Sequence, residues 1–275
     1  MKLGYTEFSF GYAFTENLIR SSAQAPAGAP QFPNLVQEAQ LGYDVRIDLP
    51  ACPIFFQFKL PELMVRDTAK EISVHQLPGI HCNFFRMSLM KRNLSYQHQH
   101  LIRLEQQHPG RVLYATPTMQ TPATFNSAYN QASVHLNSAL FSPTDIGPLP
   151  DDKQHVVSYR ANSTIGWRCS SPQQVKVLPF GKVLSGAQEA FFDPKFERLE
   201  EVAPRILREL TNATPEGGRL DAQAFRERVR SRLAAIVPAD SMGSARFVVV
   251  EQLLAAREIA RIGLGVEMMI AQPHA

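Results

Sequence analysis

Residues 42–59 read GYDVRIDLPACPIFFQFK, and this stretch decides the predicted fold. Apolar and polar residues alternate in YDVRIDL, between Gly42 and Pro50, which is typical of a half-buried strand. The aromatic-rich run PIFFQFKL at 53–60 predicts a more buried strand. Because few residues join these segments, we expect adjacent antiparallel strands.

Working outward, the patterns predict a mixed α/β arrangement. Helical spacing of Phe10, Phe14 and Leu18 indicates a helix over 9–22, with Ser9 as its cap. Further extended segments are predicted at 34–40, 84–90, 111–117, 155–160 and 167–169, with helices at 95–108 (capped by Ser95) and 125–140. Beyond Leu184 the strand signals fade, and helices are predicted at 194–210, 221–236 and 245–270. We therefore expect one domain over 1–184 and a helical domain or extension over 185–275.

The composition is that of an ordinary globular protein. The 275 residues are 44% hydrophobic and 19% charged, which excludes a disordered chain and a coiled coil. The net charge of +3 neither indicates nor excludes a nucleic-acid partner. No apolar run is long enough to span a bilayer, and no secretory signal is recognised, so no membrane association is expected. Three widely spaced cysteines without a CxxC pair argue against a disulfide framework or a zinc site and favour a reducing cytoplasm.

The candidate site comes from the two strands of the opening stretch. Asp44 lies near the start of one strand, and Gln57 and Lys59 lie at the end of the next. Side chains alternate along a strand, so Gln57 and Lys59 share a face, and a hairpin would bring Asp44 close to both. The simpler interpretation is that Asp44 caps the hairpin and Lys59 protects an edge strand from aggregation.

The order Asp44, Gln57-x-Lys59 resembles the PD-(D/E)XK, or restriction endonuclease-like, nuclease superfamily. Gln57 departs from the usual acid and resembles the Gln-x-Lys variant of Mrr-type restriction nucleases. The resemblance covers roughly residues 5–120 and implies an αβββαβ core. It also implies an additional acid, for which Glu16 and Glu38 are the candidates, and polar side chains of the second core helix near the site, here Gln97 and His98.

The resemblance implies a metal-dependent nuclease that hydrolyses phosphodiester bonds in nucleic acid, with DNA the expected substrate and bacterial defence a compatible role. Mg²⁺ or Mn²⁺ would be held by Asp44, Gln57 and Glu38, because hard cations prefer oxygen ligands. Lys59 would orient the attacking water or stabilise the transition state.

Basic residues are concentrated in two segments that we predict to contact nucleic acid. Lys91, Arg92 and Arg103 lie in the first, and the second is a helix with arginines at spacings that share faces: Arg226, Arg228, Arg230 and Arg232. A solvated helix face is the alternative. Two rival functions stay open: an inactive nucleic-acid-binding or assembly subunit of the same fold, and a scaffold whose C-terminal helices bind a partner protein or form a homodimer.

Overall fold

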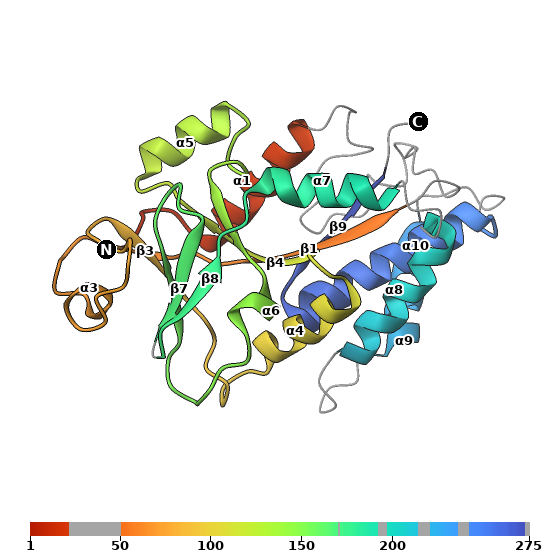
Figure 1. Cartoon of the computed structure of the whole chain (residues 1–275). Coiled ribbons are helices and arrows are strands. Elements are labelled where there is room, and N and C mark those ends of the chain that lie inside the picture. The colour runs from red at the N-terminus through yellow and green to blue at the C-terminus, as the bar shows by residue number, and fades with distance from the viewer. Residues whose placement is uncertain (22–50, 170, 192–196, 214–220, 236–241, 273–275) are drawn as a thin grey trace. The chain divides into compact units, whose positions relative to one another are not determined.

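The computed structural model describes residues 1–21, 51–169, 171–191, 197–213, 221–235 and 242–272. They form a mixed α/β structure with two sheets and a helical C-terminal region, drawn in Figure 1. The chain divides into two compact units, the first made of Met1–Ser21 and Phe56–Ser185. The described part of the second consists of residues 51–55 and those from Gly186 onward. The division after Ser185 lies one residue from the boundary predicted after residue 184, whereas residues 51–55 fall with the C-terminal unit.

The four-stranded sheet has the order β5-β4-β1-β9. Its strands are β1 (Cys52–Phe58), β4 (Val112–Pro117), β5 (Ser138–Phe141) and β9 (Glu267–Ala271). Strand β1 carries the aromatic run of the opening stretch, and it is buried from Cys52 to Gln57, as its composition predicts. Its neighbour β4 in the first unit is buried throughout. One further ladder bond, from the Lys59 N–H to the Ala115 carbonyl at 3.0 Å, continues β1 past its last residue.

A five-stranded antiparallel sheet packs on this one in the first unit, with the order β2-β3-β6-β7-β8. Its strands are β2 (Glu62–Met64), β3 (Phe84–Ser88), β6 (Val156–Tyr159), β7 (Ile165–Cys169) and β8 (Gln173–Lys176). Tyr159 joins the two sheets: its ring stacks on Phe85 and meets Phe141 edge-on, and its hydroxyl lies 2.8 Å from Thr116 Oγ1.

Helix α1 (Glu7–Arg20) covers one face of β1. Phe14 packs against Phe56 and Phe58, and a Cβ added to Gly11 would meet the Phe58 ring at 2.8 Å, so the helix approaches the strand closely. The predicted helix is confirmed, but its cap is Thr6, whose Oγ1 accepts the Ser9 N–H, and Ser9 lies inside the first turn.

Helix α4 (Gln97–Gln107) follows β3. Its N-cap is Tyr96 and not the predicted Ser95, although Ser95 Oγ accepts the Gln97 N–H at 3.1 Å. The helix predicted at 125–140 is wrong in its second half. A capping box of Thr121 and Thr124 begins α5 (Pro122–Asn130), which ends before Ala132, a residue with φ 52°. Residues 138–140 instead belong to β5.

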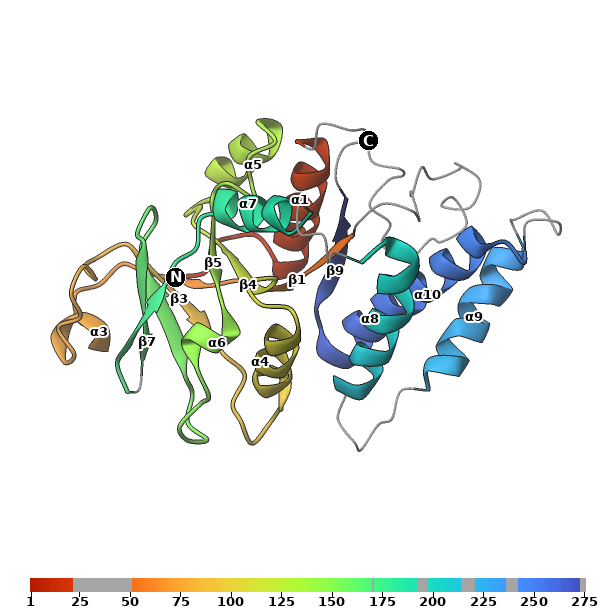
Figure 2. The same cartoon turned by 45° about the vertical axis from the view of Figure 1, so that its right-hand side comes forward.

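The remaining helices of this unit are α3 (Lys70–Ser73) and α6 (Pro143–Ile146), and α7 (Phe180–Phe191) crosses the division between the units. Figure 2 shows α4 beside α6.

Three helices form most of the described part of the second unit: α8 (Leu199–Ala213), α9 (Ala222–Ala234) and α10 (Ala245–Ile259), which lie side by side in Figures 1 and 2. Ala51, Leu199, Ala203 and Val249 form part of its core. The helix predicted to run to residue 270 is too long. It passes into a π-helical turn at Ala260–Leu264, ends at Gly265 in the left-handed region with φ 66°, and is followed by β9.

The strands predicted at 34–40 and 43–49 lie outside the described residues. The αβββαβ order can therefore be followed only in part, as α1, β1, α4 and β4. The strand predicted at 84–90 is confirmed as β3 but belongs to the other sheet.

All three cysteines carry free thiols, with Cys52 and Cys169 buried and Cys82 partly exposed. None of the helices within the described ranges has the length and apolarity to cross a bilayer.

Candidate active site

Gln57 lies near the end of β1 and is 6% exposed. Phe56 and Phe58 face α1, so the alternation of the strand directs Gln57 to the opposite face of the sheet. There its Oε1 accepts a hydrogen bond from Gln97 Nε2 at 2.9 Å, while its Nε2 donates to the Phe58 carbonyl at 3.1 Å. Both ends of this buried amide are therefore paired.

Lys59 follows one residue beyond β1, where the backbone is still held by the Ala115 carbonyl. The same alternation places it on the face of Gln57, and its side chain is partly exposed. An amide and an ammonium group from one strand thus lie on one face, and the first residue of α4 contributes a second amide to it. This is the part of the predicted site that the described residues bring together.

Two predicted acids, Asp44 and Glu38, lie outside the described residues. The third, Glu16, is on α1, on the other side of the sheet from Gln57. Its carboxylate accepts a hydrogen bond from Asn17 Nδ2 at 2.7 Å and forms an ion pair with Arg20 at 3.5 Å. Asn17 in turn bonds to the Tyr129 carbonyl and the Val134 N–H, so this cluster holds α1 to the segment around α5. The structure does not bring Glu16 to Gln57.

The fit of a divalent cation can be judged from the donors near Gln57. No group of three His, Cys, Asp or Glu side chains suited to a metal occurs among the residues described. Gln57 Oε1, a neutral oxygen in the described part of the site, already accepts one hydrogen bond. A site for Mg²⁺ or Mn²⁺ would therefore draw on Asp44 and Glu38, since Mg²⁺ in proteins is usually held by one or two carboxylates together with waters.

His98, the second polar residue predicted near the site, is buried and points elsewhere. Nε2 lies 2.8 Å from the Gly147 carbonyl and Nδ1 lies 2.9 Å from the Tyr114 hydroxyl. A carbonyl can only accept, so Nε2 carries the proton and Nδ1 accepts from the tyrosine. Burial lowers the pKa of the His98 imidazole. The residue is a neutral link between α4, β4 and the loop after α6.

Arg168 completes that link, and the sequence pattern did not single it out. It is 7% exposed, and its NH1 donates to the Ile146 carbonyl at 2.9 Å and the Pro148 carbonyl at 3.0 Å. With His98 it binds three successive carbonyls of one loop. Burial lowers the pKa of the Arg168 guanidinium. A lone arginine in a short strand carries no sequence signal for such a role.

The basic residues of α9 that we predicted to contact nucleic acid divide into those held in ion pairs with glutamates and those exposed to solvent. Arg226 and Arg230 donate to the two oxygens of Glu251 at 2.8 and 2.7 Å, and Glu251 is 1% exposed. Arg232 pairs with Glu258. These three arginines fasten α9 to α10, which is a structural task. Arg228 is exposed, with its guanidinium 4.8 Å from the centre of the Phe225 ring.

In the first unit, Arg92 pairs with Asp152 at 2.8 Å across the surface. Lys91 and Arg103 form no ion pair within the described ranges, and Arg103 is exposed on α4. The charge available to a phosphate therefore lies mainly at Lys91, Arg103 and Arg228, fewer positions than the sequence predicts.

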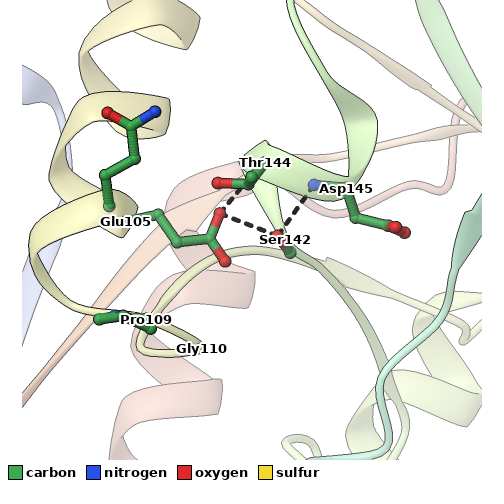
Figure 3. Close-up of a pocket in the computed structure, with 7 residues that line it drawn as sticks. Glu105, Pro109, Gly110, Ser142, Thr144 and Asp145 are labelled. Carbon is green, nitrogen blue, oxygen red and sulfur yellow. Dashed lines mark hydrogen bonds between the residues drawn. The ribbon is translucent and has the colours of Figure 1, made fainter.

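An open pocket of about 450 Å³ lies between the end of α4 and the start of α6 (Figure 3). The buried Glu105 carboxylate accepts bonds from Ser142 Oγ at 2.8 Å and the Thr144 N–H at 2.7 Å. Ser142 Oγ also accepts the Asp145 N–H. Glu105 is thus occupied in capping a four-residue helix, and the pocket adds no reactive group to the site.

Comparisons of the chain with known protein families, with curated proteins and with solved structures found no match.

Proposed function

We propose that this protein is a metal-dependent nuclease that hydrolyses phosphodiester bonds in nucleic acid, with DNA as the expected substrate and a restriction endonuclease-like αβββαβ core. The observation that best supports the proposal is the Gln57–Gln97 hydrogen bond. The resemblance implies a polar residue of the second core helix beside the strand that carries Gln-x-Lys, and this bond has that arrangement.

In this proposal Lys59 acts on the reacting phosphate. Its ammonium group would stabilise the charge that develops on the phosphoryl oxygens or orient the attacking water. Asp44 and Glu38 would hold Mg²⁺ or Mn²⁺ with the free lone pair of Gln57 Oε1, and the cation would supply Lewis-acid activation. Gln97 would keep the Gln57 amide oriented, because its donated hydrogen bond fixes which end of the amide is the oxygen.

The test is single-turnover cleavage of labelled DNA and RNA by the full chain at saturating protein, with Mg²⁺, Mn²⁺ or EDTA. Asp44→Asn and Lys59→Ala should each abolish cleavage and leave folding intact. Lys70→Ala removes an exposed lysine on α3 and serves as the matched control, which should cleave at the wild-type rate. Cleavage that survives both Asp44→Asn and Lys59→Ala would refute the assignment.

A second candidate is an inactive subunit of the same fold that binds nucleic acid or a partner protein. The observation that favours it is the pairing of both ends of the Gln57 amide, which leaves the residue satisfied without a cation. It predicts nucleic-acid binding or assembly, equal in EDTA and Mg²⁺, with no cleavage by the wild-type protein under any of these conditions.

A further inference from the structure

The loop between β3 and α4 exposes a patch of apolar, aromatic and basic side chains. Met90, Leu94 and Tyr96 are 45%, 70% and 61% exposed. Lys91 and Arg92 lie among them, and no acid occurs between Met90 and Leu104. Large apolar side chains gathered on a surface loop indicate a binding surface more often than scattered ones do.

The loop that carries the patch is well held by its own backbone. The Lys91 carbonyl accepts the N–H groups of Leu94 and Ser95, at 3.0 and 3.1 Å. The Leu89 N–H donates to the His155 carbonyl, and Gln154 Nε2 donates to the Leu89 carbonyl. The outward position of the apolar side chains is therefore imposed by a fixed turn, so little entropy would be lost on binding.

Tyr96 is the aromatic centre of the patch. Its ring packs edge-on against the His100 ring, with centroids 6.5 Å apart and planes at 73°, which holds the ring in place. Arg103 lies seven residues further along, about two helical turns or roughly 10 Å away on the same side of α4. A small pocket of about 90 Å³ opens beside Tyr96, with Arg92 and Leu149 among its walls.

We propose that this patch binds a single-stranded segment of nucleic acid, with a base stacked on Tyr96 and phosphates bound by Lys91 and Arg103. The proposal rests on the nuclease or nucleic-acid-binding function argued above and names the form of its substrate. An exposed ring can stack only on a base that is not already stacked in a duplex, and cations that precede and follow Tyr96 along the chain suit a backbone that runs past the ring. The Arg92–Asp152 pair is half exposed and easily exchanged for a phosphate contact.

The position of the patch connects it to the candidate active site. Tyr96 directly precedes Gln97, whose side chain bonds to Gln57. A nucleic-acid strand bound at Tyr96 would therefore lie next in sequence to Gln97, the residue that orients the Gln57 amide.

The experiment measures binding by fluorescence anisotropy in EDTA, so that no cleavage occurs. The probes are a labelled oligothymidylate and the same strand in a duplex with oligoadenylate. Tyr96→Ala should weaken binding of the single strand by about tenfold, in line with the loss of one stacked base, and weaken duplex binding much less. Tyr96→Phe keeps the ring and should stay within about twofold of wild type. Lys91→Ala should lower the salt dependence of single-strand binding by about 0.7 in the slope of log K against log salt.

Leu136→Ala is the matched control, because Leu136 is 63% exposed and lies between α5 and β5, outside the loop that carries the patch. The proposal is overturned if Tyr96→Ala binds like Leu136→Ala, if Tyr96→Phe loses as much as Tyr96→Ala, or if duplex and single-strand affinities fall equally. Binding of wild type to phosphatidylserine vesicles, with none to either oligonucleotide, would assign the patch to a membrane surface instead. Cleavage that survives both Asp44→Asn and Lys59→Ala would refute the nuclease assignment without altering these binding outcomes, so the two proposals fail separately.

Discussion

The side chain of Gln97 donates from Nε2 to Oε1 of Gln57 at 2.9 Å, and this bond links the start of α4 to the end of β1. Because the Gln57 Nε2 donates to the Phe58 carbonyl, the amide has a single satisfied orientation, with its oxygen turned to Gln97. That orientation is what a cation ligand would require, and it also exists without a cation.

The substitution Gln57→Glu distinguishes a Gln57 that ligates a cation from one whose hydrogen bonds are satisfied without a cation. The new carboxylate keeps the bond from Gln97, but an oxygen now faces the Phe58 carbonyl, so we expect a loss of about 1–3 kcal/mol in unfolding free energy in EDTA. If Asp44 and Glu38 complete a cation site, Mg²⁺ should recover stability more strongly in this variant than in wild type. Urea unfolding in EDTA and in Mg²⁺ is the measurement, with Gln99→Glu, an exposed position on α4, as control. Absence of any Mg²⁺ effect would favour the inactive-subunit function.

Glu251→Gln should destabilise the second unit by about 3 kcal/mol, since it removes the charge from a buried carboxylate that two arginines share. Chemical denaturation measures the change. Glu200→Gln is the control, because Glu200 is 42% exposed and lies 4.0 Å from Arg198, a pair expected to contribute less than about 1 kcal/mol. Equal effects of the two substitutions would show that the Glu251 pairs do not hold α9 to α10.

Arg228→Ala and Arg226→Ala should differ in nucleic-acid binding. Arg228 is exposed, so its loss should lower the slope of log K against log salt by about 0.7–0.9 if it contacts a phosphate. Arg226 is already paired with Glu251, so its loss should leave that slope unchanged and lower stability instead. Affinities at several salt concentrations test both statements, and an equal change in slope would mean that the intramolecular pair opens on binding.

His135→Phe should make stability less dependent on pH below about 6.5. Burial between Phe14 and Phe180 lowers the pKa of the His135 imidazole, so the unfolded chain binds the proton more readily than the folded one. This contribution to stability is present at neutral pH and is lost as pH falls through the unfolded value, at up to about 1.4 kcal/mol per pH unit. Unfolding free energies at pH 8 and pH 5 check it. A pH profile identical to that of wild type would show that His135 protonates equally in both states.

Much of the fold could be predicted because local patterns were strong. The apolar run that became β1 and the helical patterns that became α1, α8 and α9 all specify their own structure. The predictions were wrong where a single residue with positive φ interrupts a helical pattern. Ala132 and Gly265 precede segments that the apolar sequence alone could not distinguish from helix.

For the candidate site, the sequence could predict which residues of one strand share a face. Alternation alone places Gln57 and Lys59 on one face, and the helix following Ser95 places Gln97 at its first turn. The separation of Glu16 from that face was not predictable, because it depends on which side of the sheet α1 covers.

The sequence by itself determined which segments become buried strands and amphipathic helices, because those depend on periodicities of two and 3.6 residues within a few turns of chain. Only the tertiary structure decided which arginine side chains stay exposed and could contact a phosphate. Four arginines on α9 look alike in the sequence, yet Glu251 and Glu258, more than twenty residues away, pair with three of them and leave Arg228 exposed. Pairing of charges depends on distances between helices, and packing of the apolar faces sets those distances.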